Sequence, residues 1–148
     1  MTAESIFALG SNVALASWLL LVFLPRWRVT TQVVTIAVPV LLAVAYSLMI
    51  ATSWAGSAGG FTSLADVSAL FDNPWLLLAG WFHYLAFDLL VGRWELVDAR
   101  MRRIPHAFLV PCLIATFLFG PAGWLLYLGV RTVFRSMGRT TEPQGVTS

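Results

Sequence analysis

Four stretches of hydrophobic residues, separated by short polar segments, dominate the pattern of the chain. Residues 5–24 and 32–52 carry no charge, and residues 74–91 and 106–130 form two further runs. Because a helix of about 20 apolar residues spans the hydrocarbon core of a bilayer, each run predicts a transmembrane helix. The pattern therefore predicts an all-α fold, a polytopic membrane helix bundle with four transmembrane helices.

Helix-ending and helix-starting residues set the boundaries of these runs. The spacing of Ser63 and Asp66 is typical of a capping box, and apolar residues recur at helical spacing after it. We therefore expect a short interfacial helix that lies on the membrane between the second and third runs. Asn73-Pro74 is typical of a helix start, and nothing ends that helix before Pro105, so it should extend beyond the lipid.

The last run is long for one straight crossing. Gly120-Pro121 predicts a kink there, or a split into two shorter pieces. We expect four full crossings; the alternative is a re-entrant break that returns the chain to the side on which the run starts. Residues 1–134 should form one transmembrane domain, and the polar residues 135–148 a disordered tail.

Composition agrees with a membrane protein. Of the 148 residues, 59% are hydrophobic and 11% charged, whereas a soluble domain carries about 25% charged residues. All nine basic residues are arginine, and no basic cluster is typical of a nucleic-acid partner, so we expect none. The single Cys112 supports no disulfide framework.

The arginines predict an orientation. Six of them lie in the first and third loops, while the loop of residues 53–73 has two aspartates and no arginine. Because cytoplasmic loops carry the excess of arginine, the N-terminus should lie outside a cell inner membrane that the chain crosses several times. Three arginines after the fourth run oppose this assignment if that run crosses fully.

Charged and polar residues inside the third run and just after it are the candidate site. His83 and Asp88 lie within the run, and Arg93, Asp98 and His106 follow. A carboxylate at the centre of a bilayer costs roughly 3 kcal/mol on insertion scales, so its presence favours a function. On a helix Asp88 lies about 7.5 Å and roughly 140° from His83, so the two converge only if other helices surround them.

Each of these residues also has a structural interpretation. Asp88 serves equally well as the counter-charge of Arg93, and His83 as an interhelical hydrogen-bond donor. His106 is consistent with a simple interfacial cap. Trp81 lies outside the interfacial tryptophan belts and is a candidate to line a cavity.

Metal and cofactor sites are not expected. The spacing His-x₄-Asp does not match the H-x₃-H pattern with which a helix binds a metal, and two histidines are few for a membrane di-iron site. No glycine-rich phosphate-binding motif occurs.

A longer pattern of residues carries a resemblance to a known family. It consists of Trp81, His83, Leu85, Ala86, Asp88 and Leu89, followed by Arg93, Asp98, His106 and Pro111-Cys112. In this order the chain resembles the neoxanthin-synthase-like family, small integral membrane proteins named for abscisic acid deficiency in plants, with many bacterial relatives.

The resemblance implies an isomerase that acts on a carotenoid-like or other isoprenoid lipid. The plant reaction opens an epoxide and forms an allene, which requires an acid and a base and no redox cofactor. His83, Asp88 and His106 are then the expected catalytic residues, and Trp81, Arg93 and Asp98 the expected substrate-binding residues.

Two other functions stay open. One is a non-catalytic lipid or pigment binder, or an accessory subunit of a membrane complex. The other is a small transporter, which the lack of an internal repeat disfavours. The expected partner is a lipid or isoprenoid molecule, and a homo-oligomer stays open.

Overall fold

The computed structural model describes residues 2–139, and these are helical apart from short connections. The elements are α1 (Ala3–Phe23), the π-helical η1 (Val29–Val34), α2 (Thr35–Ser53), α3 (Leu64–Phe71), α4 (Pro74–Met101), α5 (His106–Phe119) and α6 (Pro121–Arg139). The described residues include no strand, which confirms the all-α prediction.

Among residues 2–139, three helices are long and apolar enough to cross a membrane. They are α1, α2 and α4, with 21, 19 and 28 residues. The expected spans over 5–24 and 74–91 fall on α1 and α4, and the span over 32–52 covers the end of η1 and nearly all of α2. Because no helix-ending residue occurs before Pro105, the third helix was predicted to extend beyond residue 91. Helix α4 does continue past Val91 and ends at Met101.

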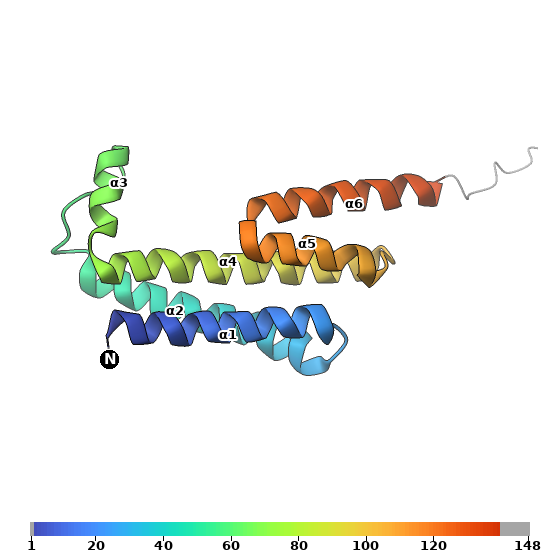
Figure 1. The fold of residues 1–148 in the computed structure, drawn as a ribbon, viewed down its shortest axis with the longest axis horizontal. Helices are drawn as coiled ribbons and strands as arrows, with labels where there is room; N and C mark the ends of the chain where they lie inside the picture. The colour runs from blue at the N-terminus through green and yellow to red at the C-terminus, as the bar shows by residue number, and fades with distance from the viewer. Residues whose placement is uncertain (1, 140–148) are drawn as a thin grey trace, which may run out of the picture. The chain divides into compact units, whose positions relative to one another are not determined.

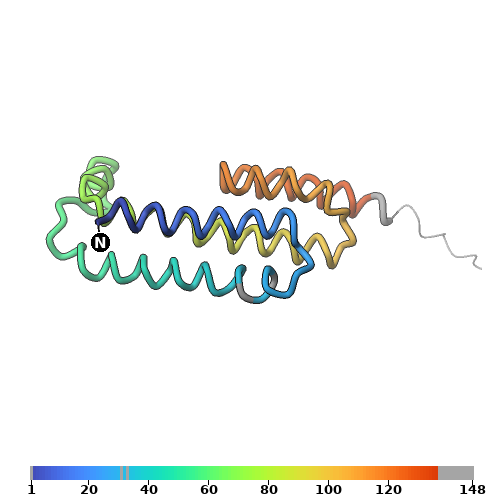
Figure 2. Tube along the Cα trace, turned by 60° about the horizontal axis from the view of Figure 1, so that its bottom comes forward, coloured from blue at the N-terminus to red at the C-terminus, as the bar shows by residue number. Residues whose placement is uncertain are grey.

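The chain divides into two compact units, one up to Leu90 and one from Val91 onward. The first unit holds α1, η1, α2, α3 and the first part of α4, which run side by side except for α3 (Figures 1 and 2). Gly10 of α1 faces the ring of Phe82 on α4, where a Cβ atom would lie 2.4 Å from the nearest ring carbon. The missing side chain therefore lets α1 approach α4 closely.

Helix α3 begins with the expected cap. The Asp66 amide donates a hydrogen bond of 3.1 Å to the Ser63 hydroxyl, which satisfies a backbone donor at the helix start. Phe71, at its other end, packs against Gly80 of α4. The helix runs across the direction of α1 and α4, as a helix lying on a membrane would (Figure 1).

The second unit contains a helical hairpin where one fourth span was expected. The chain turns at Gly120, whose φ of +50° is one that residues with side chains rarely adopt. With 14 residues, α5 is about 21 Å long, less than the roughly 30 Å of hydrocarbon that a straight crossing requires. Residues 106–130 therefore form two packed helices, the split that Gly120-Pro121 allowed, and not a single span.

The end of the chain also differs from expectation. Helix α6 continues through Arg139, so the segment predicted to be disordered from residue 135 starts as helix. The rest of that predicted tail, residues 140–148, lies outside the described residues.

Candidate functional site

One face of α4 in the first unit carries a line of aromatic and acidic residues. Trp81, Tyr84 and Asp88 follow one another at helical spacings of three and four residues, which places them along one stripe. The Trp81 indole stacks on the Tyr84 ring, with centroids 5.5 Å apart. Its Nε1 donates a 3.0 Å hydrogen bond to the Ser11 hydroxyl of α1, which fixes the orientation of the indole.

Asp88 is the buried end of this stripe. Asp88 is only 8% exposed, and the Tyr84 hydroxyl donates a hydrogen bond to its carboxylate. The Oδ2 atom is buried and has no hydrogen-bond partner among the described residues. Because unpaired buried oxygens are costly, this atom is a candidate to meet a ligand. Tyr84 was not predicted as a site residue, although its position one turn before Asp88 places it within reach.

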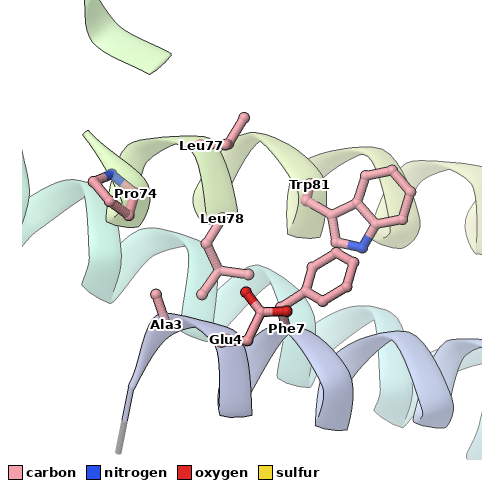
Figure 3. A pocket seen from close by; sticks show the side chains of 7 residues that line it. All are labelled: Ala3, Glu4, Phe7, Pro74, Leu77, Leu78 and Trp81. Carbon is pink, nitrogen blue, oxygen red and sulfur yellow. The ribbon is translucent and has the colours of Figure 1, made fainter. Parts of the chain in front are cut away.

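A pocket lies at the other end of the stripe. It has a volume of about 360 Å³ and lies between the start of α1 and the start of α4 (Figure 3). The residues that line it are Ala3, Glu4, Phe7, Pro74, Leu77, Leu78 and Trp81. All but Glu4 are apolar or aromatic, as is typical of small-molecule sites. Trp81, predicted to line a cavity and bind substrate, is therefore a wall of this pocket.

His83 lies on a different face of α4. Its ring stacks on Phe87 with centroids 4.6 Å apart and faces Tyr46 of α2 at 5.6 Å. Within the described part of the chain it forms no hydrogen bond with Asp88. The helical geometry explains this, since five residues along a helix separate the two side chains by roughly 140°.

The second unit contains a separate polar cluster around Asp98. Its carboxylate accepts a 2.8 Å hydrogen bond from Arg102, one helical turn farther along the chain. It also accepts a 2.7 Å hydrogen bond from the Tyr127 hydroxyl and lies 3.0 Å from Nε of Arg131. Asp98 thus binds α6 to the end of α4, and its predicted role in substrate binding stays a prediction.

Glu95 is a buried acid that was not predicted as a site residue. It is 0% exposed, and its Oε1 accepts a 2.9 Å hydrogen bond from Thr116 of α5. The signal available was its position seven residues after Asp88, two turns along the same helix face. The spacing does not predict the hydrogen-bond partner of Glu95. Thr116 lies 21 residues away in sequence and meets Glu95 only because the chain turns between α4 and α5.

The other two predicted site residues also lie in the second unit. Arg93 is partly buried, and its Nε has no hydrogen-bond partner among residues 2–139. His106 is the first residue of α5, directly after the N-cap residue Pro105, and its catalytic role stays a prediction. Within the described part of the chain, no three histidine, cysteine or acidic residues lie close enough to hold a metal ion.

Comparison with known proteins assigns the chain to a family. The family model described as ABA DEFICIENT 4-like matches residues 5–127. The Arabidopsis thaliana protein ABA DEFICIENT 4, chloroplastic, is 24% identical over 143 residues, covering 90% of this chain. This chain spans 64% of the length of that relative. No solved structure matches. Because the family model covers most of the chain, the protein belongs to the ABA4-like family.

Proposed function

We propose that the protein is a membrane isomerase that acts on a carotenoid-like isoprenoid lipid, with Asp88 as its proton-transfer group. The observation that supports this most is the environment of the Asp88 carboxylate. One part of the group is held by Tyr84, while Oδ2 is buried without a partner among the described residues. Membership of the ABA4-like family supports the substrate class.

The reaction implied by the family can be written with one proton entering and one leaving. In its acid form, the Asp88 carboxyl donates a proton to the epoxide oxygen as a carbon–oxygen bond breaks. A vinylic carbon of the conjugated chain then loses a proton to a base, and that electron pair forms the allene. Atoms balance without any oxidant or reductant, because the product is an isomer of the substrate.

The base of the second step has several candidates. The Asp88 carboxylate left by the first step is one, because the group already contacts the substrate. His83 and His106 are the histidines proposed from the sequence. The position of His83 beside Phe87, away from Asp88, favours the carboxylate.

A second function, a binder without catalysis, is supported by a different observation. The pocket beside Trp81 is apolar and needs no chemistry to hold a lipid. In that case Asp88 is a structural residue and the bound lipid is released unchanged. The two functions differ in what happens when Asp88 loses its acidity.

Expression in cells that accumulate an epoxy carotenoid separates these functions. Asp88→Asn should lower the yield of the isomer at least about a hundredfold while the protein still accumulates in membranes, because a proton-transfer group contributes about 10²–10⁴-fold. Asp72→Asn, at the exposed end of α3, is the matched control and should retain full yield. His83→Ala and His106→Ala in the same cells show whether either histidine is the base. Full yield from Asp88→Asn would refute the proposed catalytic role.

A further inference from the structure

We infer that the pocket between α1 and α4 is an anchoring site for the hydroxylated end of an isoprenoid lipid, with Glu4 accepting the hydrogen bond of the hydroxyl group. The inference rests on the proposed function for the isoprenoid class of ligand. It adds the place where one end of the lipid is held and the residue that selects it.

The walls of the pocket suit a ring-shaped apolar group. Phe7 and Trp81 lie with ring centroids 5.6 Å apart, and Leu77 and Leu78 complete the α4 side. A volume of about 360 Å³ is at the lower end of the range of small-molecule sites, so the pocket suits one end of a long lipid better than the whole molecule. The hydrogen bond of Trp81 to Ser11 holds this wall in place before any ligand arrives.

Glu4 gives the pocket its chemical preference. Its carboxylate points from α1 toward α4, beside Leu78 and Phe7 (Figure 3). Among residues 2–139 it has no hydrogen-bond or ion-pair partner, whereas the neighbouring hydroxyls of Thr2 and Ser5 bond to each other. A carboxylate accepts hydrogen bonds, and the uncharged donor that an isoprenoid lipid offers is a hydroxyl group.

The distance to Asp88 shows that the pocket anchors the lipid and does not hold the reacting group. Asp88 lies seven residues beyond Trp81 on the same stripe of α4, about 10.5 Å along the helix. A lipid with one end in the pocket therefore presents to Asp88 a group farther along its chain. Such remote contacts can supply binding energy for the reaction.

The experiment measures binding of two carotenoids to the full-length purified protein in nanodiscs. Zeaxanthin has a hydroxyl group on each ring, and β-carotene has the same carbon skeleton without them. We expect the wild type to bind zeaxanthin roughly tenfold more tightly, the size of effect that one hydrogen bond to a carboxylate gives. Glu4→Leu should reduce this ratio to about one. Asn12→Leu, on α1 but outside the pocket lining, should leave the ratio unchanged.

A second pair of variants tests the pocket itself. Leu77→Trp fills the pocket and should weaken binding of both carotenoids at least tenfold, whereas Leu41→Trp on an exposed face of α2 should not. Thermal unfolding shows whether each variant is folded. The affinities for zeaxanthin and β-carotene are measured on the same preparation, so partial misfolding lowers both and leaves their ratio unchanged. An unchanged ratio in Glu4→Leu, or unchanged binding in Leu77→Trp, would overturn the inference.

The outcome is separable from that of the proposed function. If Asp88→Asn abolishes isomer formation while Leu77→Trp binds normally, the isomerase stands and the anchoring site fails. If Leu77→Trp loses binding while Asp88→Asn keeps full yield, the anchoring site stands and the isomerase fails.

Discussion

At the residue scale, the sequence pattern predicted Asp88 as a candidate site residue but did not predict its surroundings. Its position in an apolar run predicted a group with a function, because an unpaired carboxylate in lipid is costly. The hydrogen bond from Tyr84 could have been predicted from the sequence, because Tyr84 and Asp88 are one helical turn apart. His83, the other predicted catalytic residue of this run, forms no hydrogen bond with Asp88 among the described residues, in line with their separation of roughly 140° on the helix.

Tyr84→Phe tests whether the hydrogen bond positions Asp88. Removing the hydroxyl should lower turnover about tenfold, since Asp88 loses its orienting partner, and should reduce stability by about 1 kcal/mol. Turnover of the epoxy carotenoid and thermal unfolding are measured on the same preparation. Tyr46→Phe, which leaves the ring beside His83 in place, is the control. Equal turnover in both variants would show that Tyr84 does not position the acid.

At the element scale, the residue types that begin and end helices predicted the helix starts and the turn between α5 and α6 well. Ser63 caps α3 and Gly120 ends α5, both read from residue types whose backbone preferences are strong. The partners of the second unit were not predictable in this way. Tyr127 and Arg131 meet Asp98 only because α6 folds back, a contact that spans about thirty residues of sequence.

The cap of α3 predicts a pH dependence. The hydroxyl groups of Thr62 and then Ser63 donate hydrogen bonds to the Asp66 carboxylate and hold its pKa below its ordinary value of 3.8. A lowered folded-state pKa means that the stabilisation is complete above the ordinary value and is lost as the pH falls through the folded value. Exchange of the α3 amide hydrogens should therefore stay slow from pH 7 to about 5 and become faster at lower pH, after correction for intrinsic rates. Thr62→Val should shift this transition to higher pH, and an unshifted transition would contradict the assignment.

The hairpin of α5 and α6 depends on a missing side chain. A Cβ atom on Gly123 would lie 2.0 Å from the backbone nitrogen of Thr116, so the helices could not pack as they do. Gly123→Ala should therefore destabilise the second unit by about 1–3 kcal/mol, the usual cost of overpacking. Gly129→Ala, where a Cβ atom meets nothing within 4 Å, should not destabilise it. Thermal unfolding in detergent compares the two variants, and equal stabilities would contradict the observed packing.

At the scale of the whole molecule, the hairpin changes the expected topology. Arg131 of α6 pairs with Asp98, three residues before the end of α4, so α6 returns toward the side on which α4 ends. The three late arginines, which opposed the orientation argument, then join the arginines of the loop between α4 and α5. Three crossings with the N-terminus outside would leave the chain beyond α6 on the cytoplasmic side, and not outside as four crossings require.

Cysteine labelling tests this topology. In a Cys112→Ala background, Ser57→Cys in the loop after α2 should react with an impermeant reagent added outside intact cells. Ser136→Cys near the end of α6 should react only after the membrane is opened. Four full crossings predict that both positions react from outside. Labelling of Ser136→Cys in intact cells would therefore contradict the re-entrant arrangement.

The central claim, that the protein isomerises an isoprenoid lipid through Asp88, is tested most directly by the mass of the product. Purified wild-type protein and Asp88→Asn are incubated in nanodiscs with an epoxy carotenoid and without added cofactor. The extracted carotenoids are separated by chromatography, and their molecular masses are measured by mass spectrometry. The wild type should form a new species of identical mass, and Asp88→Asn should form at least about a hundredfold less of it. A product of different mass, or equal conversion by Asp88→Asn, would contradict the central claim.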